Sequence, residues 1–140
     1  MFIDASAIVA IIMGESDSAY LVARIRDAGS TLCISPLVRF EAVFAVARTT
    51  ASHHGVPVTA DTLAAASELV DEFVLQLDVQ IIDLTGRIGA AAVDAAMKYG
   101  KVVRHPAGLN LGDCFAYASA KAIGAPLLYK GNDFAQTDLA

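Results

Sequence analysis

The sequence predicts an α/β fold in which helices cover both faces of a parallel sheet. Two observations lead to this prediction. Short apolar segments that suit buried strands alternate with longer segments whose apolar residues recur at helical spacing. Strands and helices also alternate along the whole chain, and parallel strands need helical crossovers of this kind. The 140 residues suit one domain, 1–140, that is long enough to bury a sizeable core.

Each element follows from its local pattern. Four apolar segments are predicted strands: 1–4, 31–34, 79–84 and 126–129. The predicted helices are 7–13, 16–29, 36–53, the segment that follows the turn at 56–59 and reaches Leu77, 86–99 and 112–123. Serine and threonine suit helix starts because their side-chain oxygens accept hydrogen bonds from free backbone N–H groups. The predicted caps are Ser6, Ser16, Ser35 and Thr85, and 101–109 is predicted to be a loop.

Composition and charge exclude several classes of protein. Hydrophobic residues make up 56% of the chain and charged residues 18%, unlike a disordered chain. The apolar run from Ala7 to Met13 is far shorter than the roughly 20 residues that span a bilayer, and Asp4 stands where a secretory leader carries basic residues. Cys33 and Cys114 are isolated, which indicates buried thiols. The net charge of −5 argues against a broad basic face for duplex DNA. We therefore expect a cytoplasmic protein without a membrane segment.

Four acidic residues occupy positions that suit a metal site. Asp4 and Asp133 follow predicted strands, and Asp113 begins a predicted helix. Glu41 lies within an apolar helix pattern, where exposure to solvent explains a carboxylate poorly. Ligands of open parallel sheets bind outside the carboxyl ends of the strands, so we expect the four carboxylates to converge there.

Converging carboxylates repel one another, and a cation would hold them together. Mg²⁺, with Mn²⁺ as a substitute, fits best because both ions prefer oxygen ligands. The chemistry that this site predicts is phosphodiester cleavage, in which an ion lowers the pKa of a water molecule and orients it in line with the bond that breaks.

Some of these residues also have a purely structural interpretation. Asp113 is in a position to satisfy backbone amides at a helix start, and Asp133 follows a Gly-Asn pair with turn chemistry. The three histidines lack the spacing of a zinc site. A basic cluster before Asn110 is equally consistent with contacts to RNA phosphates and with a solvated loop: Lys98, Lys101, Arg104 and His105.

Four segments, taken in order, carry a family resemblance. They are FIDASAIVAI at the start, SPLVRFEAVFAVAR around Glu41, HPAGLNLGDCFAYASAK around Asp113, and PLLYKGNDFAQTDL at the end. Over nearly its whole length the chain resembles the PIN-domain ribonucleases and, among them, the VapC-type toxins of type II toxin–antitoxin pairs.

The resemblance implies a fold, a site and partners. The fold is a three-layer α/β/α sandwich with a mainly parallel central sheet. The site is a Mg²⁺ centre formed by Asp4, Glu41, Asp113 and Asp133, which serve as both catalytic and metal-binding residues. Polar neighbours orient these carboxylates: Ser6, Asn110 and Asn132. The implied activity is endonucleolytic cleavage of tRNA or ribosomal RNA by a homodimer, which a VapB-type antitoxin inhibits by covering the acidic pocket.

Two other classes of protein compete with this interpretation. In a phosphoacceptor signalling domain, Asp83 would be the acceptor and Lys130 the sensor, although only one acid follows the first strand where a pair is needed. A catalytically silent PIN-like module would use the same groove only to bind a protein, and the four intact acids argue against it.

Overall fold

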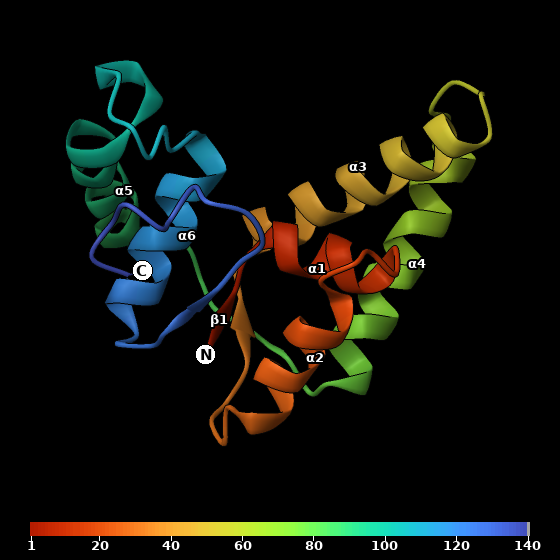
Figure 1. The fold of residues 1–140 in the computed structure, drawn as a ribbon, viewed down its shortest axis with the longest axis horizontal. Coiled ribbons are helices and arrows are strands. Elements are labelled where there is room, and N and C mark those ends of the chain that lie inside the picture. The colour runs from red at the N-terminus through yellow and green to blue at the C-terminus, as the bar shows by residue number, and fades with distance from the viewer. Residues whose placement is uncertain (140) are drawn as a thin grey trace.

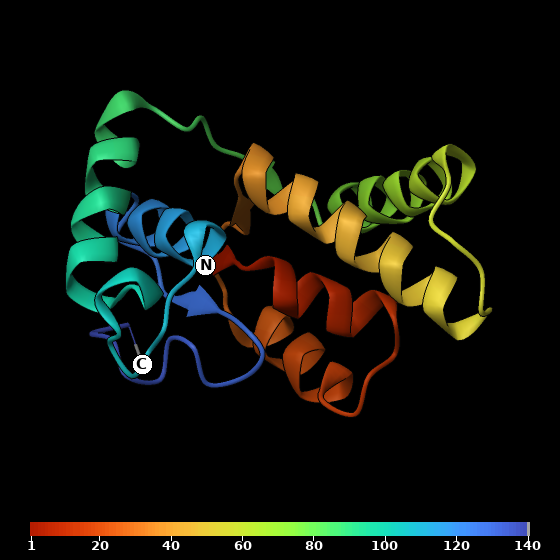
Figure 2. The same ribbon diagram turned by 90° about the horizontal axis from the view of Figure 1, so that it is seen from above.

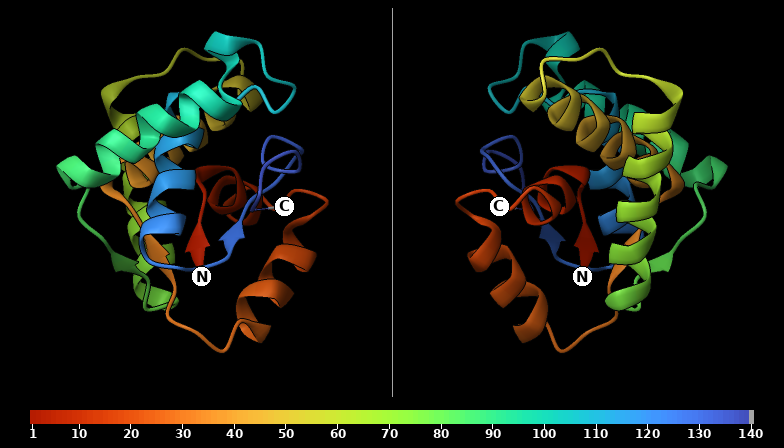
Figure 3. Two further views of the ribbon diagram at one scale, coloured as in Figure 1. Left: turned by 90° about the vertical axis from the view of Figure 1, so that its left-hand side faces the viewer. Right: turned by 90° about the vertical axis from the view of Figure 1, so that its right-hand side faces the viewer.

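Four short parallel strands form the central sheet of the protein, which we describe from a computed structural model for residues 1–139. The strands are β1 (Phe2–Ile3), β2 (Cys33–Ile34), β3 (Gln80–Ile81) and β4 (Leu127–Leu128). Their order in the sheet is β3-β2-β1-β4, and every neighbouring pair is parallel. Figure 3 shows β1 and β4 side by side and pointing the same way. The predicted parallel sheet is therefore confirmed.

Helices cover both faces of this sheet. They are α1 (Ala5–Ile12), α2 (Ser18–Asp27), α3 (Pro36–His53), α4 (Ala60–Gln76), α5 (Gly86–Tyr99) and α6 (Leu111–Ala122), with a 3-10 helix η1 (Lys101–Val103). Helices α5 and α6 lie on one side of the strands and α1 to α4 on the other (Figure 1). Helices α3 and α4 pack side by side (Figure 2). This arrangement confirms the three-layer α/β/α sandwich.

The strands are shorter than the sequence predicts. Each has two residues, whereas the apolar segments have four to six. Single backbone hydrogen bonds extend the pairing at the ends of β1: Phe2 donates to the carbonyl of Pro126 at 2.8 Å and Asp4 to that of Leu128 at 2.9 Å. Apolar character reflects burial in the core more than backbone pairing in a sheet, so a prediction based on apolar segments overestimates strand length. The predicted strand 79–84 exceeds the observed strand by the largest number of residues. The observed strand, β3, is exposed and lies at the edge of the sheet.

Helix starts follow the predicted chemistry at two sites and differ at two others. Ser35 accepts a hydrogen bond from the N–H of Val38 at 3.2 Å, and Thr85 caps α5 in the same way. The predicted cap at Ser6 is wrong, because Asp4 caps α1 instead. Ser16 is not a cap either, since α2 begins after Asp17. Aspartate caps helices as well as serine does, and the sequence pattern alone does not separate neighbouring candidates.

The predicted loop 101–109 is more ordered than expected. It begins with η1 and ends where Leu109 forms a parallel bridge with Gly100. Arg104 closes η1 in the left-handed conformation, with φ of 59°. Two hydrogen bonds, from the N–H of Lys101 to the carbonyl of Leu109 and from the N–H of Leu109 to the carbonyl of Tyr99, join the two ends of the loop.

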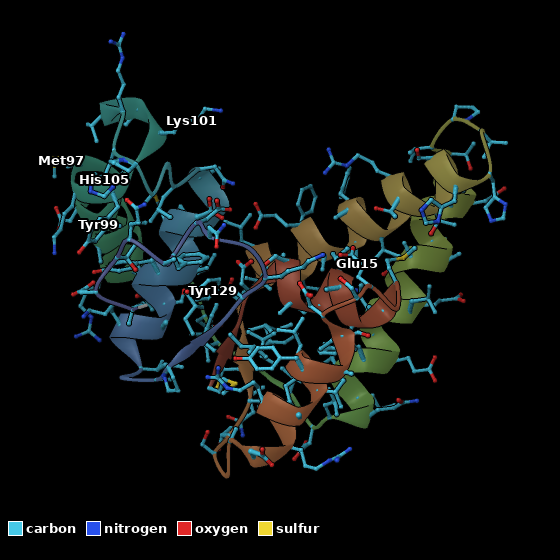
Figure 4. All side chains as sticks on the ribbon, viewed as in Figure 1. Glu15, Met97, Tyr99, Lys101, His105 and Tyr129 are labelled. Atoms are coloured by element: carbon cyan, nitrogen blue, oxygen red, sulfur yellow. The ribbon has the colours of Figure 1, made fainter. Side chains whose placement is uncertain are left out.

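Asp138 fastens the C-terminal segment to α5 and α6. Its carboxylate accepts hydrogen bonds from the hydroxyls of Tyr117 at 2.5 Å and Tyr99 at 3.3 Å, and it pairs with Lys121 at 3.0 Å. The hydrogen bonds from Tyr117 and then Lys121 lower the pKa of Asp138 to about 2. Tyr99 also contacts His105 edge to face at the end of α5 (Figure 4). The structure thus gives Asp138 an anchoring role.

One hydrophobic core joins the layers. Phe2, Ile3, Ile8 and Ile34 are completely buried within it. Both cysteines are free and buried, as predicted. None of the helices in residues 1–139 has the length and apolarity that crossing a membrane requires.

Candidate active site

An acid-lined cavity of about 560 Å³ lies at the carboxyl ends of β1 and β4. Asp4 directly follows β1, and Asp133 lies in the segment after β4. Glu41 comes from the second turn of α3, and Asp113 from the first turn of α6. All four side chains line the cavity. The fold therefore brings together the four acids that the sequence singles out.

Asp4 is held in place by its role as the cap of α1. Its Oδ2 accepts hydrogen bonds from the backbone N–H of Ser6 at 2.9 Å and from the Ser6 hydroxyl at 2.6 Å. The same hydroxyl accepts a hydrogen bond from the N–H of Lys130 at 3.0 Å, which links β4 to the site. Burial raises the pKa of Asp4, the hydrogen bonds from Ser6 lower it, and the charge of Asp133 raises it again. Ser6 thus contacts the carboxylate that it was predicted to orient.

Asp113 and Asn110 form a capping box at the start of α6. The N–H of Asn110 donates to Oδ2 of Asp113 at 2.8 Å, and the side chain of Asn110 accepts from the N–H of Asp113 at 3.1 Å. Burial raises the pKa of Asp113 to about 6, although the hydrogen bond from Asn110 acts in the opposite direction. The structural interpretation of Asp113 is therefore correct, and the same contacts fix its carboxylate at the cavity.

Glu41 depends on a glycine in the facing helix. Its carboxylate lies against the backbone of Gly112 in α6, where a Cβ atom would collide with both carboxylate oxygens. Burial raises the pKa of Glu41 to about 7, with further contributions from the charges of Asp4 and Asp113. A half-buried carboxylate thus lies close to two others and forms no ion pair with a basic residue of 1–139.

Asp133 and Asn132 differ in their positions. Asp133 is exposed but lines the cavity. Asn132 does not line it, and its side chain makes no hydrogen bond within residues 1–139. Its carbonyl instead accepts from the N–H of Ala135, in the turn after β4. The prediction that Asn132 orients a carboxylate therefore has no contact to support it.

The cavity also contains residues that the sequence did not single out. Phe40 and Phe44 lie within the apolar helix pattern around Glu41, yet they are exposed at the cavity. Arg48 also lines the cavity from α3, and Lys130, which lines it too, forms an ion pair with Glu15. Helical spacing is the signal that finds Phe44 and Arg48, because residues three and seven positions after Glu41 share its face.

The basic cluster before Asn110 does not reach this cavity. Lys101 lines a separate, apolar cavity between α5 and α6, and Lys98 lies over the ring of Tyr99 at 4.6 Å. None of the four basic residues of the cluster lines the acidic cavity.

The donor set of the cavity suits a hard divalent cation. Three of its carboxylates have raised pKa values because they are buried close together, and a cation would relieve that repulsion. Within the described chain, no three acidic, histidine or cysteine side chains are placed to ligate one ion together. Mg²⁺ accepts such a site, because it typically retains several waters and takes one or two carboxylates.

The fold and the cavity define a class of α/β/α proteins with an acidic site at the carboxyl edge of the sheet. Residues 1–139 match the PIN domain family. The chain is 50% identical over 139 residues to VapC ribonuclease R02377 of Rhizobium meliloti (strain 1021), covering 99% of this chain and 98% of the relative. It is 37% identical over 140 residues to Ribonuclease VapC36 of Mycobacterium tuberculosis, covering 99% and 91%. The chain therefore belongs to the PIN domain family, and its resemblance to VapC proteins is confirmed.

Two solved structures share the fold. The crystal structure of Mycobacterium tuberculosis VapC20, described as a Sarcin-Ricin loop cleaving toxin, has a TM-score of 0.69 and 16% identity, covering 96% of this chain and 92% of that one. A toxin–antitoxin complex from Klebsiella pneumoniae has a TM-score of 0.64 and 16% identity, covering 99% and 92%. At this identity, the two structures support the architecture alone.

Proposed function

We propose that this protein is a Mg²⁺-dependent endoribonuclease toxin. The observation that carries the proposal is the convergence of Asp4, Glu41, Asp113 and Asp133 on one cavity in a chain of the PIN domain family. Relatives that align over almost the whole chain are named VapC ribonucleases, which supports RNA as the substrate.

The four acids have different roles in the proposed metal site. Asp4 and Asp113 would hold Mg²⁺ most directly, because their other contacts already fix their carboxylates, and Glu41 and Asp133 would add negative charge around the ion. A bound ion would supply Lewis-acid chemistry, by which the pKa of a water molecule would fall and charge on the phosphate would be neutralised, and Mn²⁺ would substitute for Mg²⁺. Ser6 and Asn110 keep two of the carboxylates oriented, as neighbours of metal ligands commonly do.

The finer parts of the proposal concern substrate and partners. We infer that the target is tRNA or ribosomal RNA, and the second is in line with VapC20, a Sarcin-Ricin loop cleaving toxin that shares the fold. A VapB-type antitoxin would cover the acidic cavity, in line with the toxin–antitoxin complex that shares the fold. A homodimer would bury exposed apolar side chains of α5, η1 and α6: Val93, Met97, Val102 and Leu111. Two free cysteines suit action in the cytoplasm.

Substitution of single acids tests the proposal. Asp4→Asn and Asp113→Asn each keep an oxygen that accepts the capping hydrogen bond, so both variants should fold normally. Each should reduce cleavage by about 100-fold or more, because a bound ion contributes several kcal/mol of charge stabilisation. The assay incubates the purified protein with total RNA, in Mg²⁺ or chelator, and maps new RNA ends.

The control is Asp83→Asn, which alters an exposed acid outside the cavity and should leave cleavage unchanged. Full activity of Asp4→Asn or Asp113→Asn would refute the assignment, as would equal cleavage in chelator. Stable labelling of Asp83 by acetyl phosphate would favour the phosphoacceptor class instead. A silent binding module would bind an antitoxin tightly but show no affinity for Mg²⁺.

A further inference from the structure

The acidic cavity has an aromatic wall. Phe40 and Phe44 lie one turn apart on α3, with ring centroids 4.4 Å apart and planes inclined at 31°. Both line the cavity, although 55% of Phe40 and 41% of Phe44 is exposed to solvent. They are the only aromatic residues among those that line the cavity in residues 1–139. Exposed aromatic rings next to a polar site indicate a binding surface for a ligand or a macromolecule.

A cation extends this wall. Arg48 lies one turn beyond Phe44 on α3 and also lines the cavity. Lys130, the other basic residue there, is paired with Glu15, whereas Arg48 has no ion pair in the described part of the chain. Arg48 also lines a second pocket, which extends along α3 as far as His53. The wall therefore leads away from the acids along one helix and carries an available positive charge.

The dimensions of the wall suit a single strand of nucleic acid. From Phe40 to Arg48 the helix rises about 12 Å, at 1.5 Å per residue. This rise corresponds to roughly three stacked nucleotides at 3.4 Å each. If a phosphate lies at the acids, the adjoining nucleotides extend over this wall, because Phe40 and Phe44 line the same cavity as the acids.

The chemistry of the wall favours unpaired bases. Bases inside a duplex are already stacked, so only unpaired bases present a free face to an aromatic side chain. The cavity carries more acidic than basic residues, and the whole chain has a net charge of −5, so general attraction of phosphates contributes little. Stacking supplies affinity that does not depend on charge.

We propose that Phe40 and Phe44 form a stacking surface for unpaired bases next to the cleaved phosphate, and that Arg48 contacts a phosphate further along the strand. This inference rests on the proposed ribonuclease function and specifies its substrate as an unpaired segment of RNA. An apolar segment of a protein partner is the competing occupant. RNA is favoured because the rings share one cavity with the acids and because a cation continues the same wall.

Binding to short RNA tests the stacking surface directly. The probe is a fluorescent mixed-sequence single strand of about 12 nucleotides, within the usual range of single-strand sites. Stopped-flow anisotropy in Mg²⁺ separates binding from slower cleavage, and a duplex of the same sequences is measured in parallel. The double variant Phe40→Leu/Phe44→Leu keeps apolar bulk but removes the rings, whereas Phe40→Tyr/Phe44→Tyr retains stacking.

We expect the leucine variant to bind the single strand about 10-fold or more weakly, because each stacked base contributes about 1–3 kcal/mol. The tyrosine variant should bind it like the wild type, and duplex affinity should change little in either. Arg48→Gln should lower the slope of log affinity against log salt by about 1, as loss of one phosphate contact does. The matched controls, Leu75→Ala and Arg26→Gln, alter exposed residues outside the cavity and should change neither quantity.

The outcomes separate this inference from the proposed function. If the wild type cleaves RNA and the leucine variant binds single strands as well as the wild type does, the stacking surface is refuted and a protein partner becomes the better occupant. If the wild type binds single strands through these rings but cleaves no RNA, the ribonuclease proposal fails while the stacking surface stands. Weakened binding by the tyrosine variant would also contradict stacking.

Discussion

Individual residues in this site serve structure and chemistry at once. Asp4 caps α1, and Asp113 closes the capping box of α6, while both direct a carboxylate oxygen toward one cavity. A helix start leaves backbone N–H groups without partners, and an acid that satisfies them is held more rigidly than a surface acid. The structural and functional interpretations of Asp113, which compete when only the sequence is considered, are therefore compatible.

Residue types predict the candidate site well, but individual contacts less so. The four acids stand out because carboxylates at strand ends and helix starts are conspicuous in an apolar chain. Asn132 looks equivalent to Asn110 in the sequence, yet only Asn110 contacts an acid. The difference arises from the turn after β4, whose geometry depends on packing that a local pattern does not encode.

Gly112 provides a test at the scale of one residue. Gly112→Ala places a methyl group where the Glu41 carboxylate lies, so Glu41 should be displaced and cleavage should fall by roughly 10-fold or more, as when other supports of a metal site are lost. Stability should stay within about 1 kcal/mol of the wild type, because alanine favours a helix and the displaced group is flexible. RNA cleavage and urea unfolding measure the two effects.

Gly86→Ala is the matched control for this substitution. Gly86 is also helical, but an added methyl group would meet nothing within 4 Å. Its cleavage rate should equal that of the wild type. If both alanine variants cleave at the wild-type rate, the position of Glu41 does not depend on Gly112.

At the scale of elements, helices are more predictable than strands. The start of α3 at Pro36 and that of α5 at Gly86 follow the predicted caps, because cap chemistry is local. The strands are reduced to two residues each, because pairing depends on neighbours that are distant in the sequence. This error does not affect the prediction of the site, because the order and direction of β1 and β4 position Asp4 and Asp133.

The tail that carries Asp138 gives a prediction for one element. Asp138→Asn removes a charge that accepts hydrogen bonds from Tyr117 and Lys121, and it should destabilise the protein by about 1 kcal/mol after allowance for solvent exposure. The pKa of Asp138 is lowered to about 2, so its contribution is present above the usual value of 3.8 and is lost as the pH falls toward 2. The difference in stability between wild type and variant should therefore shrink in acid.

Urea unfolding at neutral pH and near pH 3 measures this difference. The control is Asp94→Asn, because Asp94 is an exposed acid of α5 with no hydrogen bond or ion pair from its side chain within residues 1–139. A difference that is absent at neutral pH would show that the tail is not anchored through Asp138.

At the scale of the whole molecule, repulsion among the clustered acids is relieved when a proton or a cation binds. The core and sheet are apolar and closely packed, and at one edge they carry buried and half-buried carboxylates that form no ion pair within the described residues. Repulsion among these acids disfavours the folded state without metal, while a ligand that binds only the folded state stabilises it. Stability and cation binding should therefore be coupled, and the coupling should depend on pH.

The sign of this pH dependence follows from Glu41 and Asp113. Folding raises their pKa values to about 7 and about 6, from usual values of 4.5 and 3.8, so the folded state binds more protons. The stability that protonation of Glu41 and Asp113 contributes is fully present below the usual pKa values of these groups. It is lost as the pH rises through 6 to 7. Without metal, Glu41→Gln should match the wild type near pH 4 and should exceed its stability at pH 8, by about 1 kcal/mol after allowance for partial exposure.

Addition of Mg²⁺ should reverse this ranking at pH 8. The wild type should gain stability in proportion to the logarithm of the ion concentration above the dissociation constant, whereas Glu41→Gln should gain less because it has lost one of the acids that attract the ion. Urea unfolding at both pH values, each with chelator or with Mg²⁺, measures stability under all four conditions. Asp83→Asn is the control, because this exposed acid lies outside the cavity. An equal gain in wild type and Glu41→Gln would place the ion elsewhere, and a difference independent of pH would show that the carboxylates do not repel one another in the folded protein.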